Sequence, residues 1–399
     1  METKPIEHVR VLSSDIGCRM IGTPGNQAAA AYIAGEFQRF GLAVETLPFP
    51  CPAWSSEKTS LSVNGQALPA YANTFSPACD AAGPLLPLGS MAELEAADLA
   101  GKILVLYGEL ALGPLSAKGF FFAGEQDLKR IARLEAQQPL AVLVTNPMPG
   151  MRWRLIEDPD FGVPSATVTL EVGRELVKCG GTAAHIRIAA HRAEGSSAHV
   201  VARLPGTGSG RIVLCAHYDT KLDTPGAVDN ACGVAALLAL AERLARVPRQ
   251  TALEFVAFSN EEYYTSPERD VYFQANGETF REISAAINMD GFGNLVSVTN
   301  IAAFAASEQF EALVEAARLC SPGVIRTDPW PSSDHYLFFS HGVPSVAISG
   351  TGAVSLGHTP EDSLEWVSAK KLETVVSLVA GLIAELDGKD PGWGRVQEG

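Results

Sequence analysis

The sequence predicts an α/β fold with a mostly parallel sheet and a smaller inserted domain that is rich in strands. Residues 211–216 form a continuous apolar run that indicates a buried strand, and residues 232–246 have the apolar face of a helix. Between about residues 64 and 191 the pattern changes to short strands separated by turn residues. This change of pattern indicates that a second domain interrupts the first.

The predicted elements follow one another in order along the chain. Residues 25–41 predict a helix with Asn26 as its cap and Gly41 as its end, and residues 43–62 alternate as a strand does. Inside the insertion there are strand patterns at 102–107, 141–144 and 165–170 and a helix pattern at 126–137. The later strand patterns are residues 253–258, 285–289 and 346–348. We therefore expect a main domain of residues 1–65 and 190–399 and an inserted domain of residues 66–189.

Chemically reactive side chains follow the predicted strands. His217 comes directly after the strand of residues 211–216, and Asp229 precedes the next helix. The other candidates that follow strands are Glu261, Glu262, Asp290 and His358. Because ligands bind at the carboxyl ends of strands in open α/β sheets, these residues can converge on one edge. Two imidazoles and three carboxylates suit a pair of zinc ions with one bridging carboxylate, which leaves a fourth carboxylate as general base.

This ordered set resembles that of the co-catalytic zinc exopeptidases, which include bacterial leucyl aminopeptidases, aminopeptidase Y and glutamate carboxypeptidase. The runs Arg19-Met-Ile-Gly-Thr-Pro-Gly-Asn26 and Ser333-Asp-His335 strengthen the resemblance. It implies a mixed, mostly parallel sheet sandwiched by helices. It also implies two Zn²⁺ ions per chain, the first held by His217 and Asp290 and the second by Glu262 and His358. Asp229 would bridge both ions, and the peptide bond that follows it would be cis. Glu261 would be the general base, and Asp219 would hold the imidazole of His217.

The substrate pocket is less well determined. Many members of the family place a tyrosine directly before the last histidine, where this chain has Gly357. The metals and one of Tyr218, Tyr336 or His335 would then stabilise the oxyanion, and the pocket candidates are Tyr218, Asp334 and His335. The inserted domain resembles the protease-associated domain of many members in the runs at residues 98–105 and 163–168.

The resemblance implies a metallopeptidase that removes N-terminal residues from peptides. The alternative on the same site is a carboxypeptidase or dipeptidase. A carboxypeptidase would need a cation to bind the terminal carboxylate, and no Lys or Arg lies within six residues of Glu261, Asp290 or His358 along the chain. Three arginines remain as candidates for that cation: Arg269, Arg281 and Arg326. The competing functions are those of a single-zinc acyltransferase like glutaminyl cyclase, a non-catalytic binding protein and an acyl-amino-acid deacylase. The intact ligand set disfavours the first two, and the short gap between the first His and the bridging Asp disfavours the third.

Composition narrows the class of partner. With 45 acidic and 30 basic residues the net charge is −15, which disfavours nucleic acid and anionic membranes. No run reaches the roughly 18 apolar residues of a membrane span. The first residues lack the apolar core of a signal peptide, and the seven scattered cysteines suit reduced thiols. We expect a cytoplasmic enzyme, or a secreted one if a signal segment has been removed, that acts on a peptide or small amide; its oligomeric state stays open.

Overall fold

The computed structural model describes residues 3–120, 123–263, 270–352 and 356–396. The chain divides into two compact units. The main unit comprises Met1–Pro50, Ser196–Glu262 and Pro267–Gly399, and the inserted unit comprises Cys51–Gly195 and Tyr263–Ser266. The inserted unit is longer at both ends than the expected residues 66–189, because strands β1 (Ala43–Val63) and β8 (Ala183–Leu204) each contribute residues to both units.

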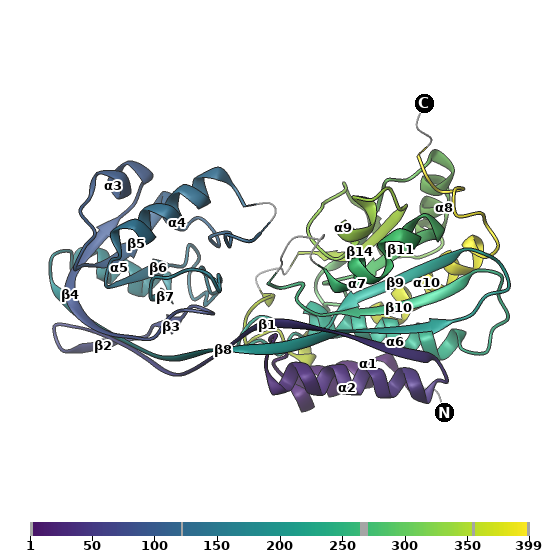
Figure 1. Cartoon of the computed structure of the whole chain (residues 1–399), viewed down its shortest axis with the longest axis horizontal. Coiled ribbons are helices and arrows are strands. Elements are labelled where there is room, and N and C mark those ends of the chain that lie inside the picture. Colours follow the sequence, from purple (N-terminus) through teal and green to yellow (C-terminus); the bar gives the residue numbers. More distant parts are fainter. Residues whose placement is uncertain (1–2, 121–122, 264–269, 353–355, 397–399) are drawn as a thin grey trace. The chain divides into compact units, whose positions relative to one another are not determined.

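The main unit is built on a mixed sheet in the order β13-β12-β14-β11-β9-β10-β8 (Figure 1). Strand β9 runs parallel to both of its neighbours, β10 and β11, and β14 runs parallel to β11. Strands β12 and β8 are antiparallel to β14 and β10, respectively. The strands not yet given bounds are β9 (Arg211–His217), β10 (Ala252–Phe258), β11 (Ile283–Met289), β12 (Val298–Phe304), β13 (Val324–Arg326) and β14 (Ser345–Thr351). The predicted mixed and mostly parallel sheet is confirmed.

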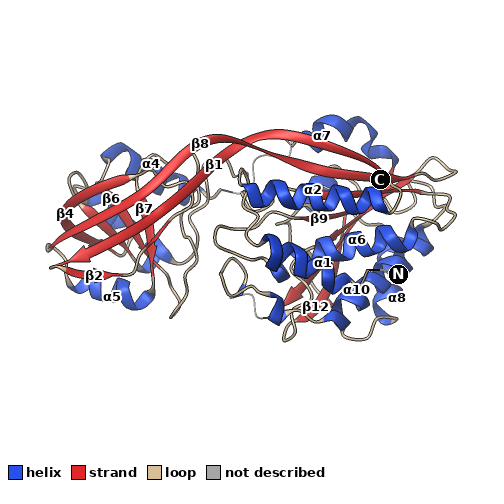
Figure 2. Ribbon diagram, turned by 90° about the horizontal axis from the view of Figure 1, so that it is seen from below, coloured by secondary structure: helices blue, strands red, loops and turns tan. Residues whose placement is uncertain are grey.

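Helices cover both faces of this sheet. Figure 2 shows α1, α2, α6 and α10 along one face, and α8 packs on the same side. The opposite face is covered by α7, α9 and the 3₁₀ turn η5. These helices are α1 (Pro5–Arg10), α2 (Pro24–Arg39), α6 (Cys232–Leu244), α7 (Val271–Asn276), α8 (Glu308–Leu319), α9 (His335–Phe339) and α10 (Ala369–Leu386), and the shorter turns are η1 (Val11–Ile16), η3 (Ala227–Ala231), η5 (Gly277–Glu282) and η7 (Leu364–Trp366).

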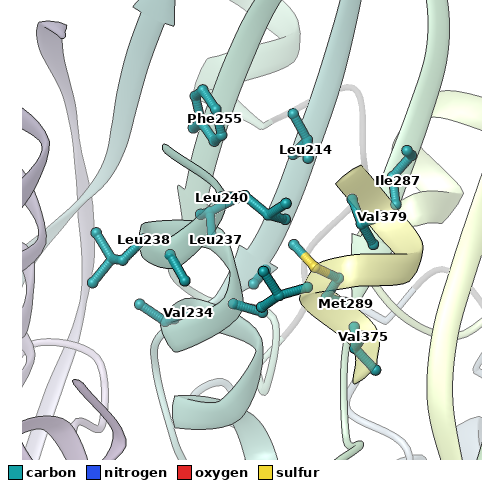
Figure 3. Packing of buried hydrophobic residues seen from close by; sticks show 14 of the residues in the cluster. Leu214, Val234, Leu237, Leu238, Leu240, Phe255, Ile287, Met289, Val375 and Val379 are labelled. Atoms are coloured by element: carbon teal, nitrogen blue, oxygen red, sulfur yellow. The ribbon is translucent and has the colours of Figure 1, made fainter. Parts of the chain in front are cut away.

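The alternation of side chains along β9 explains these two layers. Leu214 points into the core beneath α6 and α10, whereas Val213 and Cys215 point into the core beneath α7 and α9. Figure 3 shows Leu214 and Leu240 in the first of these cores. Burying each such side chain stabilises the fold by about 1.5–3 kcal/mol. The strands nearest the site are therefore anchored on both faces.

The predicted helix near the N-terminus is present, but its cap differs from the expectation. Thr23, and not Asn26, caps α2: its hydroxyl accepts a hydrogen bond from the amide of Asn26 at 3.3 Å. The buried side chain of Asn26 instead donates to the carbonyl of Arg19 and to the hydroxyl of Ser259, each at 3.0 Å. Asn26 thus ties the start of α2 to the segment that follows β10.

The inserted unit is itself of mixed α/β type. Its strands follow the order β8-β4-β5-β6-β7-β3, and β1 pairs with β2. The expected strands β5, β6 and β7 and the expected helix α4 are present, whereas α3 and α5 were not expected. Its resemblance to a protease-associated domain stays a prediction. Its elements are β2 (Gln66–Leu68), β3 (Tyr71–Ala72), β4 (Cys79–Leu88), α3 (Met91–Ala96), β5 (Ile103–Leu106), η2 (Gly108–Ala111), α4 (Glu125–Gln137), β6 (Ala141–Thr145), β7 (Ser165–Val168) and α5 (Leu170–Lys178).

Among the helices that the structure describes, none is both long enough and apolar enough to cross a membrane.

Helix α6 begins in close contact with the end of β11. The side-chain amide of Asn230 donates to the carbonyl of Met289 at 2.9 Å and accepts from the amide of Gly233 at 3.0 Å. A Cβ atom on Gly233 would lie 2.2 Å from the same carbonyl oxygen. Only glycine fits there without a backbone shift, so this contact fixes the distance between the start of α6 and the end of β11.

The substitution Gly233→Ala should therefore lower the free energy of unfolding by about 1–3 kcal/mol, the usual cost of overpacking. Gly35→Ala is the matched control, because Gly35 lies exposed in α2 with no atom within 4 Å of its Cβ position. That control should raise the free energy of unfolding by up to about 1 kcal/mol. Denaturant unfolding of both variants would measure the difference, and equal stabilisation by both would contradict the close contact.

Candidate metal centre

The register of the central strands brings the predicted site residues to one edge of the sheet. His217 ends β9 and pairs with Phe258 at the end of β10, and Glu261 and Glu262 follow shortly after. Asn288 of β11 pairs with Cys215, which puts Asp290 level with His217. The amide of Asp290 also donates to the carbonyl of Ile348 in β14 at 2.9 Å. This is the carboxyl edge of the parallel strands, where α/β proteins bind ligands.

Five predicted ligands form two groups that share Asp229. In the first group, Nε2 of His217 lies 3.1 Å from Oδ1 of Asp229 and 3.2 Å from Oδ1 of Asp290. In the second group, Nε2 of His358 lies 3.2 Å from Oδ2 of Asp229 and 3.2 Å from Oε2 of Glu262. The two oxygens of Asp229 thus face different imidazoles. The peptide bond after Asp229 is cis, as the resemblance implied.

The donor set fits divalent metal ions. One ligand atom each of His217, Asp229 and Glu262 lies within 4.8 Å of the other two. Tetrahedral ligands at about 2.0–2.2 Å from zinc are themselves about 3.3–3.6 Å apart, close to the separations observed here. Among the described residues no hydrogen-bond partner reaches Oε1 of Glu262, although this atom is buried. Burying a carboxylate oxygen without a hydrogen-bond donor is costly, and a bound cation would offset this cost.

The electrostatics of the site favour positive charge. Burial opposes protonation of His217 and His358, yet the surrounding carboxylates outweigh it and hold the pKa of both imidazoles well above the ordinary value. Burial likewise opposes ionisation of Asp229, but its hydrogen bonds to the two imidazoles outweigh burial and lower the pKa of its carboxyl group. The same potential that retains protons on the imidazoles attracts metal cations, which bind as those protons leave.

Asp219 supports the site through its backbone carbonyl and through its carboxylate, which forms an ion pair with His217. The Nδ1 atom of His217 donates to the backbone carbonyl of Asp219 at 3.2 Å, whereas the nearest carboxylate oxygen lies 3.6 Å away. The carboxylate of Asp219 also accepts from the amides of Glu261 and Glu262, each at 3.2 Å. The carbonyl therefore fixes the tautomer of His217 with Nε2 free for a metal. The carboxylate fixes the turn that carries the two glutamates.

Glu261 lies beside the ligands without belonging to either group. Burial is the main cause that raises the pKa of its carboxyl group well above the ordinary range, and the negative charges of Asp290, Glu262 and Asp334 add to it. The positive charge of His217 lowers the pKa of the Glu261 carboxyl group. A carboxylate with a raised affinity for protons, next to a metal-binding group, has the property that general acid–base catalysis requires.

Two of the three pocket candidates do not face the site. Tyr218 is fully buried and its hydroxyl donates to the carbonyl of Ala198 at 2.7 Å. His335 is also fully buried: Nε2 donates to the carbonyl of Trp330 at 2.7 Å and Nδ1 accepts from Asn288 at 3.3 Å. Burial lowers the pKa of His335 to about 4, so its ring is neutral. Their polar atoms are occupied by protein partners, which is why neither is available to a substrate.

Asp334 remains the pocket candidate with open binding capacity. It is buried, and among the described residues no hydrogen-bond partner reaches its Oδ2 atom. Burial raises the pKa of its carboxyl group, and the positive charge of His217 opposes this shift. Its carboxylate is therefore close enough to the metal-binding groups to interact with them electrostatically.

Several residues of the site escaped the sequence analysis. The ammonium of Lys221 donates to the carbonyl of Glu262 and lies 3.9 Å from Oε2 of the same residue. The hydroxyl of Ser333 donates to Oδ2 of Asp290 at 2.7 Å. The carboxylate of Asp362 accepts from the backbone amide of Asp229 at 3.0 Å. Ser333 and Asp362 both lie in runs that contain predicted site residues, so their proximity in sequence was an available signal.

A mixed sheet with imidazoles and carboxylates converging at its carboxyl edge defines an α/β protein with a candidate metal-binding centre. Comparison with known proteins points to a particular family. Residues 199–383 match the family model of Peptidase family M28. The matched range contains all five predicted ligands and Glu261.

The chain is also similar to curated relatives and to solved structures. The chain is 24% identical to aminopeptidase YwaD of Bacillus subtilis over 392 residues, which cover 94% of this chain and 82% of the relative. It is also 24% identical over 292 residues to a Mycobacterium tuberculosis protein described as "Probable lipoprotein aminopeptidase LpqL", covering 70% of this chain and only 56% of that relative. The structure of BSAP, a zinc aminopeptidase from Bacillus subtilis, has a TM-score of 0.78 and 22% identity and covers 97% of this chain and 95% of its own. This likeness shows the shared fold.

Proposed function

We propose that the protein is a zinc aminopeptidase that holds two zinc ions per chain and removes N-terminal residues from peptides. The observation that carries the proposal is the single carboxylate of Asp229 between two imidazoles, 3.1 and 3.2 Å from their Nε2 atoms. The match to Peptidase family M28 and the aminopeptidase names of the relatives support the peptide substrate.

Each zinc ion would be held by three of these side chains. His217, Asp290 and one oxygen of Asp229 would hold the first ion. Glu262, His358 and the other oxygen of Asp229 would hold the second. When bound, zinc supplies Lewis acidity, which acidifies water and polarises a peptide carbonyl. Three protein ligands per ion leave room for substrate, as catalytic zinc sites require.

Glu261 would move the protons of the reaction. A carboxylate oxygen of Glu261 takes a proton from the attacking water and then gives it to the departing nitrogen of the cleaved peptide. The turn fixed by the carboxylate of Asp219 keeps Glu261 in place. General acid–base groups of this kind contribute about 10²–10⁴-fold to the rate.

The direction of cleavage depends on the charge that faces the substrate terminus. Carboxylates surround the site, which favours a cationic N-terminus. Of the three arginines considered for a carboxypeptidase, Arg326 pairs with Glu311, Arg281 is exposed, and Arg269 lies outside the described residues. Lys221 is a cation close to Glu262 that the spacing along the chain did not reveal. Because its ammonium is already hydrogen bonded to the carbonyl of Glu262, we assign it to the support of that ligand.

Three competing functions predict different behaviour. A single-zinc acyltransferase like glutaminyl cyclase would need only one of the two donor groups. A non-catalytic binding protein would not need Glu261 beside intact ligands. An acyl-amino-acid deacylase would cleave acyl-amino acids in preference to peptides. The presence of both donor groups and of Glu261 favours the aminopeptidase over the first two. The short gap between His217 and Asp229 disfavours the third.

The metal content tests the first part of the proposal. Exhaustive chelation should abolish hydrolysis of amino-acid arylamides, and added Zn²⁺ should restore it, because the donor groups themselves supply no Lewis acid. Metal analysis should give about two zinc ions per chain. His358→Ala should reduce this to about one, because His358 serves only the second donor group. A ratio near one in the wild-type protein would favour the acyltransferase, and full activity without metal would exclude the proposal.

The two adjacent glutamates should respond differently to the same substitution. Glu261→Gln should retain both zinc ions and lose at least about 10²-fold in kcat, because it removes proton transfer alone. Glu262→Gln is the matched control and should weaken metal binding, since its Oε2 atom belongs to the second donor group. Steady-state kinetics and metal analysis of both variants would separate the two roles. Nearly normal turnover of the Glu261 variant would overturn its assignment.

Blocking the termini of a good peptide substrate tests the direction of cleavage. N-terminal acetylation should prevent cleavage, because it removes the positive charge that the surrounding carboxylates attract. C-terminal amidation should have little effect. Mass spectrometry of the products from the free, acetylated and amidated peptides would show which terminus is required. The reverse pattern would make the enzyme a carboxypeptidase.

A further inference from the structure

The loop that carries the bridging carboxylate is held by hydrogen bonds between its backbone and two buried residues, Arg19 and Asp362. We call residues 225–229 the bridging loop. Its first two residues, Pro225 and Gly226, offer their carbonyls to Arg19. Its last three residues bond through their amides to Asp362. The five backbone groups are consecutive along the chain, so the loop is fixed from both sides.

Among the residues that the structure describes, the guanidinium of Arg19 binds backbone carbonyls. Its guanidinium donates to Pro225 at 2.7 Å and to Gly226 at 2.8 Å, and also to Tyr218, directly after the metal-binding histidine, at 2.7 Å. It also reaches carbonyls of Leu12 and Gly17. Burial lowers its pKa to about 10, so the guanidinium stays charged at neutral pH. Arg19 therefore connects the segment after β9 to the bridging loop.

Asp362 holds the other end of the loop. Its carboxylate oxygens accept from the amides of Val228 at 2.9 Å and Asp229 at 3.0 Å, and its carbonyl accepts from the amide of Ala227 at 3.2 Å. Asp362 is fully buried and follows His358 by four residues. Asp362 thus links the segment that contains His358 to the backbone of Asp229.

We propose that Arg19 and Asp362 are positioning residues that fix the bridging loop so that the two oxygens of Asp229 face the two metal-binding groups before any metal binds. The inference rests on the proposed function, because it assumes that both groups bind zinc. Neither residue touches metal or substrate. Both act through the backbone of the bridging loop.

The geometry of the loop explains why it needs such support. Asp229 and Asn230 have non-helical backbone angles where the chain enters α6, so helical hydrogen bonds do not hold them. Gly226 has a φ of +59°, and a Cβ there would lie 2.3 Å from Cγ2 of Thr220. Hydrogen-bond partners that orient metal ligands typically change metal affinity or activity by about 10–100-fold when they are removed.

Substitution of Asp362 gives the direct test. Asp362→Asn keeps one acceptor oxygen and presents an NH₂ group to the other backbone amide, and Asp362→Ala removes both acceptors. Zinc affinity, measured by competition with a chelator, should fall by about tenfold or more in the Asn variant and further in the Ala variant. The thermal midpoint of each metal-free variant should be recorded in parallel, so that lost affinity is distinguished from lost stability.

Asp387→Ala is the matched control. Oδ1 of Asp387 accepts from two consecutive backbone amides, those of Gln250 at 2.9 Å and Thr251 at 2.7 Å, but neither belongs to the metal centre. This control should lower the thermal midpoint and leave zinc affinity unchanged. Wild-type affinity in both Asp362 variants would overturn the inference while the proposed function stands. Absence of zinc binding by the wild-type protein would instead overturn the proposed function.

A measurement on the wild-type protein keeps the inference testable if the Asp362 variants do not fold. Hydrogen exchange at the amides of Ala227, Val228 and Asp229 should stay slow after zinc is removed, because their bonds to Asp362 do not depend on metal. Arg19→Lys should speed this exchange, since a single ammonium cannot replace the fork of donors. Rapid exchange of the three amides in the metal-free wild-type protein would show that metal, and not these side chains, orders the loop.

Discussion

The sharing of one carboxylate by two imidazoles is the constraint on which the site depends. The two oxygens of Asp229 are only about 2.2 Å apart by covalent geometry, so His217 and His358 must approach from opposite sides. The two histidines end or follow β9 and β14, which are separated in the sheet by β11, and β11 is followed by Asp290. The parallel register of β9, β11 and β14 is therefore as necessary to the chemistry as the ligands themselves.

Concentrating carboxylates in a buried site is costly, because each charge loses its water. The protein offsets this cost with backbone groups that are already fixed by the fold. The amides of Glu261 and Glu262 neutralise part of the charge on Asp219, and those of Val228 and Asp229 do the same for Asp362. The carboxylates of Asp229, Asp290 and Glu262 are left facing the two imidazoles.

The sequence predicted the elements that bear the site because their signals are local. The apolar runs of β9, β10 and β11 and the polar residues directly after them need no knowledge of the rest of the fold. The supporting contacts could not be predicted in the same way. Lys221 binds a carbonyl 41 positions away along the chain, and Asp362 binds amides at a separation of 133 and 134. Any residue presents the same carbonyl and amide, so the sequence carries no mark of these partners.

The candidates that faced away from the site illustrate the same limit. Tyr218 follows the predicted ligand His217, yet strand alternation turns its ring toward the core, where it is fully buried. His335 was singled out by its motif, but the aromatic rings of Phe304 and Trp330 enclose it. Polarity and position suggested exposure to substrate for both. Only the packing of neighbouring elements decided the direction of each side chain.

Strands β1 and β8 have a consequence for any exchange of the inserted unit between related proteins. Both strands continue through the boundary between the units, so the unit cannot be removed as a simple loop between two anchored ends. In β8 the same strand later pairs with β10 in the sheet of the main unit. A junction placed within β8 must preserve the alternation of side chains between the two faces of the sheet, because a shift by one residue turns every following side chain to the other face. Chimaeras would therefore tolerate insertions of even length at this junction far better than those of odd length.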